Sequence, residues 1–256
     1  MRESPPLIAV DVGNARIKLG WFESGGGEGL PEPGRTLDLP VDPTASPLKF
    51  DRLATWLAQG GSRGASWWVG SVNRPAAASL VDWLGGHRPD DIVAHVTAAE
   101  VPLEVALPRP DLVGIDRLLD AVAANELRAA GRPAVVVDLG TAITVDWVSA
   151  EGRFCGGAIL PGMAMAARAM HEFTDLLPPL DVSRLDSPPP ALGDSTVGAM
   201  RSGLFWGSVG AIDRLMAQMR VDAAVEPDLV ITGGGGLAVA RALGPMARYI
   251  PHLTLA

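Results

Sequence analysis

The chain contains one cysteine, one tyrosine and four histidines. Because Cys155 is the only cysteine, no disulfide can form within the chain and no cysteine cluster can bind a metal. The histidines are scattered, so a thiol nucleophile would have no evident base partner. We therefore expect Cys155 to be a buried packing residue.

Positive charge is also scarce. Lysine and arginine total 21 against 29 aspartates and glutamates, and no basic run or basic stripe occurs, which disfavours a nucleic-acid partner. The longest apolar runs are too short to cross a membrane, and the first ten residues lead straight into a predicted strand rather than a signal peptide. The composition thus predicts a soluble, cytoplasmic protein with neither a nucleic-acid nor a membrane partner.

Two common nucleotide-binding signatures are missing. The sequence has no G-x-x-x-x-G-K-[ST], and no G-x-G-x-x-G follows the first predicted strand. These absences disfavour a P-loop protein and a Rossmann dinucleotide-binding protein.

One pattern is present twice. DVGNARIKLGWF begins at Asp11 and DLGTAITVDWVS begins at Asp138, an offset of 138 − 11 = 127 in a chain of 256 residues. In each copy an apolar run ends at an aspartate, a glycine follows, and an alternating stretch predicts the second strand of a hairpin. One such turn alone is typical of ordinary tight turns. The repeat instead favours two similar lobes whose aspartates and backbone N–H groups face a nucleotide triphosphate and its metal.

The order of predicted elements indicates an α/β fold of two similar lobes with a central nucleotide cleft. We place an N-terminal lobe at 1–114 and a C-terminal lobe at 115–256, linked by a helix over about 115–130. Segments 24–34 and 178–190 are predicted to be surface connections because they are rich in glycine and proline. The pattern predicts strands over 7–12, 16–22, 35–39, 66–72, 134–138, 142–149, 153–159 and 228–232, and helices over 49–59, 75–85, 115–130, 163–177, 194–219 and 237–247.

The segment GIDR, residues 114–117, places an aspartate and an arginine at a predicted helix start, where N–H groups favour anions. Asp116 is either a first-turn helix stabiliser or a base that accepts a proton from a substrate hydroxyl. Arg117 is either a surface charge or a group that holds a substrate by directed hydrogen bonds.

Three further segments combine small residues with predicted helix starts. GGAILPG at 156–162 and TGGGG at 232–236 each follow a strand, where small residues allow either close ligand approach or tight packing. The helix after Asp194 and Ser195, two N-cap candidates, repeats small residues at Ala199, Gly203, Gly207 and Gly210. Because each helical glycine costs about 1 kcal/mol relative to alanine, we expect this stripe to pack against another helix, within the lobe or across a dimer.

Taken in order, DVGNARIK, GIDR, DLGTAITVD, GGAILPG and ITGG make the chain resemble the type III pantothenate kinase family of the actin and sugar-kinase superfamily. The resemblance implies ATP-dependent phosphorylation of pantothenate, the first step toward coenzyme A, by a homodimer that uses Mg²⁺ and a monovalent cation, K⁺ or NH₄⁺. It implies that Asp116 is the catalytic base, that Asp138 binds the monovalent cation, and that Asp11 lies near Mg²⁺ through the phosphates. Phosphate and nucleotide contacts would come from Asp11, Val12, Gly13, Asn14, Ala15, Arg16, Ile17, Lys18, Thr141, Gly233 and Gly234, and substrate contacts from Leu107, Gly114, Ile115, Asp116, Arg117 and Thr196.

The sequence departs from the family pattern at two places. Ala15 stands where the family usually carries threonine, and Leu107, Arg109 and Pro110 stand where it carries tyrosine and then Asn-Pro. These departures bear on substrate affinity. They also keep two alternatives open, a catalytically weak nucleotide-binding regulator and a kinase of another small hydroxylated substrate.

Overall fold

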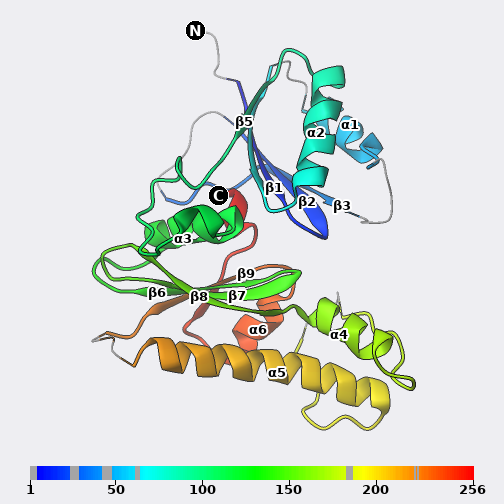
Figure 1. Cartoon of the computed structure of the whole chain (residues 1–256), viewed down its shortest axis with the longest axis vertical. Coiled ribbons are helices and arrows are strands. Elements are labelled where there is room, and N and C mark those ends of the chain that lie inside the picture. Colours follow the sequence, from blue (N-terminus) through cyan, green and yellow to red (C-terminus); the bar gives the residue numbers. More distant parts are fainter. Residues whose placement is uncertain are drawn as a thin grey trace. The chain divides into compact units, whose positions relative to one another are not determined.

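The computed structural model describes residues 5–23, 29–41, 48–60, 64–182, 187–221, 223 and 225–256. The chain forms two compact units (Figure 1). Unit 1 comprises residues 1–102, 109–126 and 254–256, and unit 2 comprises 103–108 and 127–253. The predicted loop at 24–34 lies partly outside the described residues, as does the connection at 178–190.

Each unit contains one five-stranded sheet with the same topology. The sheet of unit 1 has the order β3-β2-β1-β4-β5, formed by β1 (Leu7–Val12), β2 (Arg16–Phe22), β3 (Arg35–Pro40), β4 (Ser66–Ser71) and β5 (Ile92–His95). The sheet of unit 2 has the order β8-β7-β6-β9-β10, formed by β6 (Ala134–Leu139), β7 (Ala142–Val148), β8 (Phe154–Pro161), β9 (Asp228–Thr232) and β10 (Ala247–Tyr249). In both sheets the aspartate-bearing strand pairs antiparallel with the next strand and parallel with a later one. The predicted α/β fold with an internal repeat is confirmed.

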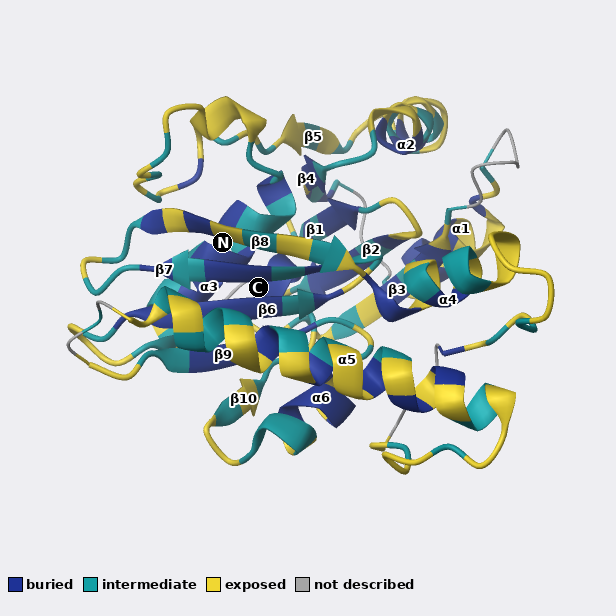
Figure 2. Ribbon diagram, turned by 60° about the horizontal axis from the view of Figure 1, so that its bottom comes forward, coloured by how far each residue is buried: buried dark blue, intermediate teal, exposed yellow. Residues whose placement is uncertain are grey.

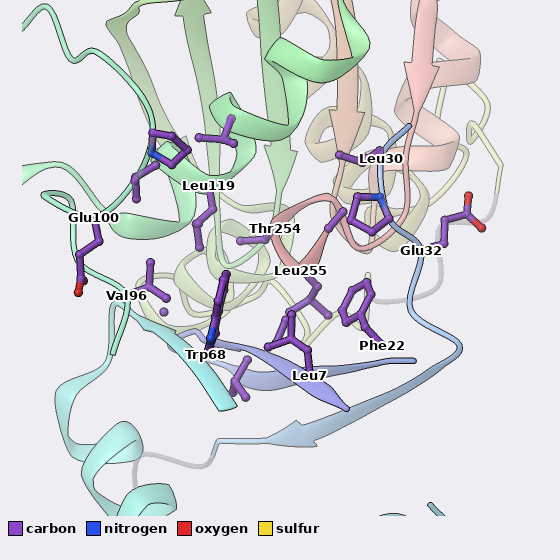
Figure 3. A pocket seen from close by; sticks show the side chains of 18 of the residues that line it. Leu7, Phe22, Leu30, Glu32, Trp68, Val96, Glu100, Leu119, Thr254 and Leu255 are labelled. Atoms are coloured by element: carbon purple, nitrogen blue, oxygen red, sulfur yellow. The ribbon is translucent and has the colours of Figure 1, made fainter. Parts of the chain in front are cut away.

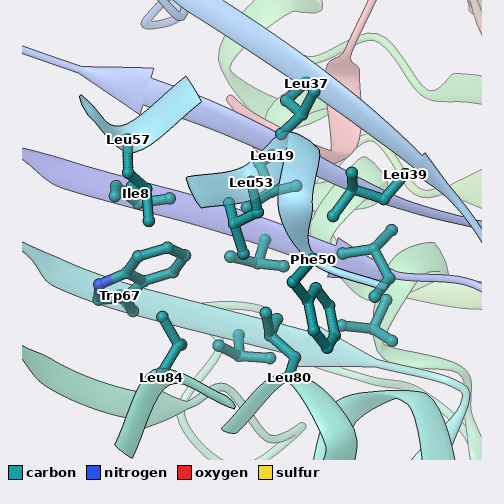
Figure 4. Close-up of a cluster of buried hydrophobic side chains, with 14 of the residues drawn as sticks. Ile8, Leu19, Leu37, Leu39, Phe50, Leu53, Leu57, Trp67, Leu80 and Leu84 are labelled. Carbon is teal, nitrogen blue, oxygen red and sulfur yellow. The ribbon is translucent and has the colours of Figure 1, made fainter. Parts of the chain in front are cut away.

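The core of unit 1 lies between one face of its sheet and two helices, α1 (Asp51–Ala58) and α2 (Arg74–His87). Side chains alternate across a strand, so Ile8 of β1 and Trp67 of β4 point to this face and are fully buried. Leu53 of α1 and Leu80 of α2 pack in the same cluster (Figure 4). The strand residues between these core positions therefore belong to the opposite face.

Helix α3 (Ile115–Leu127) packs on that opposite face. A Cβ at Gly70 of β4 would lie 3.1 Å from Leu119 Cδ1 and 3.6 Å from Ile115 Cγ2. The structure therefore groups α3 through Glu126 with unit 1, whereas the sequence placed this helix at the start of the second lobe. The glycine on β4 allows this close approach, which the sequence of α3 alone does not reveal.

In unit 2, α4 (Met163–Glu172), α5 (Thr196–Met219) and α6 (Gly236–Leu243) contribute to the core around β6 and β7. Helix α5 alternates buried and exposed bands along its length (Figure 2). Phe205, Val209 and Ile212 form its buried stripe. Two short 3₁₀ turns, η1 (Pro110–Leu112) and η2 (Leu253–Leu255), complete the described elements. Among the described helices none is both long enough and apolar enough to cross a membrane.

The structure corrects several sequence predictions. Strands β5 and β10 were missed because they have four and three residues, and β10 begins where a helix over 237–247 was expected. Helix α4 ends at Glu172 rather than 177; Thr174 Oγ1 then donates to the Met170 carbonyl, and His171 Nδ1 is 2.8 Å from the Leu177 carbonyl oxygen. Cys155 is exposed, not buried, because β8 is an edge strand and Cys155 points away from the core.

Asp91 anchors the connection between α2 and β5. Its carboxylate accepts hydrogen bonds from the Ala65 backbone at 2.9 Å, from Trp67 Nε1 at 2.8 Å and from Arg88 Nε at 2.8 Å. Burial alone would raise the pKa of Asp91, but the hydrogen bonds from Arg88, Ala65 and Trp67 outweigh it and hold the pKa below its ordinary value. The ionised carboxylate therefore stabilises the folded unit.

Asp91→Ala is expected to lower the free energy of unfolding by about 3 kcal/mol, because it leaves the Arg88 charge and two N–H groups without their acceptor. Since the folded-state pKa is depressed, the stabilisation is present above the ordinary carboxyl pKa and is lost as the pH falls through the folded-state value. Urea unfolding at neutral and acidic pH measures both effects, with Asp90→Ala, an exposed neighbour, as control. An equal loss in both variants would contradict the assignment.

Candidate active site

In unit 1 the first repeated motif forms a hairpin whose aspartate faces away from the apolar core. Asp11 follows the alternation of β1 onto the face that α3 covers, and it pairs with Lys18 of β2 and Gly70 of β4. Lys18 Nζ lies 3.2 Å from Asp11 Oδ2, and the Asp11 side chain is 8% exposed. The strand end thus holds a carboxylate and an ammonium group side by side, a pair suited to a metal-bound phosphate chain.

The turn between β1 and β2 is exposed at its tip. The Gly13 N–H donates to the Arg16 carbonyl at 2.9 Å, while Asn14 and Ala15 are exposed. Arg16 lies 3.4 Å from Asp38 in an exposed ion pair. Val12 and Ile17 are buried, so their side chains anchor the hairpin and only their backbone could meet a ligand.

Asn73 supports this turn and was not identified from the sequence. Its side chain caps α2 by accepting from the Ala76 N–H at 3.2 Å, and its Nδ2 lies 3.5 Å from the Gly13 carbonyl oxygen. An asparagine followed closely by Pro75 is a helix N-cap signal, so the cap was predictable. Its contact with Gly13 joins segments 60 residues apart and was not.

Asp116 lies in the first turn of α3. Its Oδ1 accepts a hydrogen bond from the Arg117 backbone N–H at 2.9 Å. A Cβ at Gly114 would stand 2.5 Å from the same oxygen, so the glycine keeps room for the carboxylate in this position. Ile115 is buried against β4 and fixes the start of the helix.

The surroundings of Asp116 alter its acidity. Burial raises the pKa of Asp116 above its usual range, and the negative charge of Asp11 adds to the increase. The hydrogen bond from the Arg117 backbone and the positive charges of Arg117 and Lys18 act in the opposite direction without cancelling it. A carboxyl with a raised pKa is a better proton acceptor than an ordinary aspartate, and perturbed acidity of this kind is typical of functional sites.

In unit 2 the second repeated motif places Asp138 at the end of β6 among glycine backbones. A Cβ at Gly233 would lie 2.5 Å from Asp138 Oδ1, and one at Gly140 would lie 3.4 Å from Oδ2. Gly233 has a φ of +88°, which other residues rarely adopt. Tyr249 Oη donates to the Gly233 carbonyl at 3.3 Å and steadies this turn. Sequence reasoning did not single out Tyr249, whose signal would have been that it is the chain's single tyrosine.

The remaining predicted residues of unit 2 occupy four places. The Thr141 carbonyl accepts from the Gly162 N–H at 3.1 Å, so the turn after Asp138 packs against the start of α4. Thr196 opens α5 and is exposed, directly after Ser195, which caps the helix by accepting from Gly198 N–H at 3.1 Å. Leu107 packs on β8, where a Cβ at Gly156 would lie 3.3 Å from Leu107 Cδ2. Gly234 follows Gly233 in the turn before α6.

The donor groups fit the two cations differently. Among the described residues no group of three or more histidine, cysteine, aspartate or glutamate side chains could hold a metal ion. Mg²⁺ keeps several waters and binds proteins through one or two carboxylates together with substrate phosphates, so Asp11 fits an ion delivered with a nucleotide. Asp138 lies against the backbone of Gly140 and Gly233, and its carboxylate is the group in unit 2 that could bind a monovalent cation.

Comparison with solved structures shows the fold. Component A of (R)-2-hydroxyglutaryl-CoA dehydratase from Acidaminococcus fermentans aligns with a TM-score of 0.53 at 13% identity, over 99% of this chain and 96% of that one. The activator of 2-hydroxyisocaproyl-CoA dehydratase from Clostridium difficile, solved with bound ADPNP, aligns with a TM-score of 0.52 at 12% identity, over 98% and 92%. The chain has the fold of the actin and sugar-kinase superfamily.

Comparison with sequences shows the family. The chain is 35% identical to the type III pantothenate kinase of Rubrobacter xylanophilus over 262 residues, covering 97% of this chain and 94% of that relative. It is 44% identical to the enzyme of Rhodopirellula baltica, covering 72% and 67%. The match to the Gluconobacter oxydans enzyme, at 40% identity, spans 53% of that relative. The family model for type III pantothenate kinase matches residues 7–218, which include both repeated motifs and Asp116, and the chain belongs to the type III pantothenate kinase family.

Proposed function

We propose that the chain transfers the γ-phosphoryl group of ATP to the terminal hydroxyl of pantothenate, the first step of coenzyme A biosynthesis. The observation that carries this proposal is the clustering of Asp11, Lys18 and Asp116 on one face of unit 1, where the charges of Asp11 and Lys18 act on the acidity of Asp116. In this cluster Asp116 would be the base, Lys18 the positively charged side chain, and Asp11 the carboxylate that faces Mg²⁺. Phosphoryl transfer requires alignment and charge neutralisation more than covalent chemistry, so such a set suffices.

In the proposed reaction Asp116 accepts the proton of the pantothenate hydroxyl while the hydroxyl oxygen forms a bond to the γ-phosphorus. The bond from the γ-phosphorus to the β,γ-bridging oxygen breaks, and ADP leaves. Lys18 and the backbone N–H groups of the exposed turn residues Asn14 and Ala15 hold the phosphates, and Arg117 holds the pantothenate. Gly114 keeps space for Asp116, and Ile115 fixes the helix that carries it. Leu107 and Thr196 are proposed to complete the pantothenate pocket, and Thr141, Gly233 and Gly234 to bind the nucleotide.

Mg²⁺ bound through ATP and Asp11 would neutralise phosphate charge, and K⁺ or NH₄⁺ at Asp138 would add positive charge in an acidic protein. Because the reaction consumes ATP, we place the enzyme in the cytoplasm, where ATP is abundant.

A coupled ADP-release assay with ATP, Mg²⁺ and pantothenate tests the proposal, run with potassium and with sodium only. We expect ADP release that depends on pantothenate. Pantetheine, glycerol and glucose serve as alternative acceptors in the same assay. ADP release with one of these but not with pantothenate would identify a kinase of another substrate, and tight ATP binding without turnover would support the regulator.

We also propose that the chain forms a homodimer through α5. Gly203, Gly207 and Gly210 are exposed, and a Cβ built at any of them would meet nothing within 4 Å. Among the described residues nothing packs on these three glycines, so we propose a second copy of the chain as the packing partner. Thr196 begins the same helix, so the partner would lie next to the proposed pantothenate contact.

Gly207→Leu is expected to produce a monomer and to weaken pantothenate binding more than ATP binding, because the new side chain blocks close helix contact. The substitution itself favours the helix by up to about 1 kcal/mol, so loss of the dimer cannot be assigned to unfolding. Light scattering and the two dissociation constants measure the outcome. Gly85→Leu is the matched control, since Gly85 is an exposed glycine of α2 with equally open surroundings. A monomeric parent, or a monomeric variant with unchanged pantothenate affinity, would refute the link.

A further inference from the structure

Unit 1 contains a cavity that none of the proposed catalytic steps uses. It has a volume of about 770 Å³, within the range of roughly 300–1,000 Å³ typical of small-molecule sites. It lies on the α3 side of the sheet, toward the beginning of β1, where Leu7 and Ala9 are exposed to it (Figure 3). Asp11 belongs to the same face at the other end of β1.

The walls of the cavity are largely apolar and come from several parts of unit 1, among them β1, β2, β4, α3 and η2. Phe22 of β2 and Leu255 of η2 lie next to each other in Figure 3, and a Cβ at Gly20 would lie 3.1 Å from Phe22 Cε2 and 3.3 Å from Leu255 Cδ1. Leu119 of α3 lies above them in Figure 3. Trp68 of β4 stands in the middle with 56% of its surface exposed. A large aromatic side chain that borders a cavity and remains this exposed offers a flat apolar surface for a ligand.

The charged groups at the cavity are all of one sign. Glu23, Glu32 and Glu100 are the charged side chains among the described lining residues, which include no lysine, arginine or histidine. Figure 3 shows Glu100 and Glu32 at opposite ends of the apolar floor. Glu100 accepts hydrogen bonds from the Thr97 N–H and Oγ1, both at 2.8 Å, and these hold its pKa below the ordinary range. Glu100 is therefore ionised at neutral pH.

We propose that this cavity binds a small organic cation, an amine with an aromatic or branched aliphatic body. The apolar floor with Trp68 takes the body, and the carboxylate at one end, Glu32 or Glu100, takes the ammonium group. Negative charge at the rim disfavours ATP, pantothenate and phosphorylated products, all of which are anions. The site is thus separate from the proposed kinase chemistry, and the inference does not rest on it.

Three probes with one apolar body test the charge preference: phenylbutylamine, phenylbutanol and phenylbutyrate, titrated calorimetrically at fixed ionic strength. We expect the amine to bind roughly tenfold more tightly than the acid, with the alcohol between them. Trp68→Ala should weaken the amine and the alcohol by about fivefold each, through lost aromatic contact. Ile92→Ala, which removes an exposed apolar side chain of β5 outside the cavity, should leave both unchanged.

The charge contribution is isolated by Glu32→Gln/Glu100→Gln, which should reduce the difference between amine and acid to about twofold while the alcohol keeps its affinity. The matched control is Asp82→Asn/Glu126→Gln, two exposed carboxylates of unit 1 outside the cavity. Equal affinity of the parent for all three probes would overturn the proposal, as would an amine affinity unaffected by Trp68→Ala. Saturating ATP and pantothenate should leave amine binding unchanged, and displacement by either would assign the amine to the substrate site instead.

Discussion

Asp116→Asn is expected to lower kcat by about a hundredfold to ten-thousandfold, because asparagine keeps the shape of the side chain but cannot accept the proton of the substrate hydroxyl. Oδ1 of asparagine can still accept the Arg117 N–H hydrogen bond, so the start of α3 is preserved. Steady-state ADP release measures the loss. Asp111→Asn, at an exposed position five residues earlier, should stay within about twofold of the parent.

The raised pKa of Asp116 leads to two further expectations, one for the pH dependence of kcat/KM and one for the stability of the variant. Because the base must be ionised, kcat/KM of the parent should decline with acidification at a pH above the ordinary aspartate range. A carboxyl whose pKa is raised by folding destabilises the fold above that pKa, so Asp116→Asn should be at least as stable as the parent at neutral pH. Loss of activity together with loss of stability would point to a structural role, and turnover within threefold of the parent would remove Asp116 from the mechanism.

Activity is expected to require a monovalent cation, and the two repeats suggest why. Register pairs Asp11 with Lys18 in unit 1, but pairs Asp138 with Thr144 in unit 2. The first strand-end aspartate thus has an ammonium group opposite it, and its counterpart has a neutral hydroxyl. We expect K⁺ or NH₄⁺ to take the place at Asp138 that Lys18 occupies at Asp11.

The comparison leads to a gain-of-function test. Asp138→Ala should lower activity in potassium to the level of the parent in sodium-only buffer. In a separate variant that keeps Asp138, Thr144→Lys should make activity largely independent of potassium. The lysine ammonium group would lie across from Asp138 as Lys18 does from Asp11. Thr36→Lys, on β3 of unit 1, controls for added charge. Full parent activity in sodium-only buffer with ammonium excluded would show that Asp138 holds no required cation.

The sequence predicted the features that depend on local pattern. Apolar runs ending at Asp11 and Asp138 predicted both hairpins, and the helix start at GIDR predicted the position of Asp116. Tertiary contacts account for what it missed. The exposure of Cys155 depends on β8 being an edge strand, and the attachment of α3 to unit 1 depends on Gly70 of β4.

In the candidate site, too, the sequence predicted what residue type decides and missed what distant contacts decide. The residue type of Ser195 predicted a helix N-cap, and the structure confirms this cap. The supports at Asn73 and Tyr249 reach their turns from 60 and 16 residues away, so no local pattern indicates them. The roles of the individual site residues, the nucleotide cleft and the dimer stay predictions for the experiments above.

Tyr249, whose hydroxyl donates to the Gly233 carbonyl, can serve as a spectroscopic probe of the glycine turn before α6. Because Tyr249 is the only tyrosine among 256 residues, tyrosine labelled with ¹³C at Cζ alone would give a single carbon resonance in an NMR spectrum, with no assignment needed. The chemical shift of that resonance responds to the hydrogen bond of the phenol. A nucleotide titration followed through this one signal would therefore record the state of the glycine turn independently of catalysis.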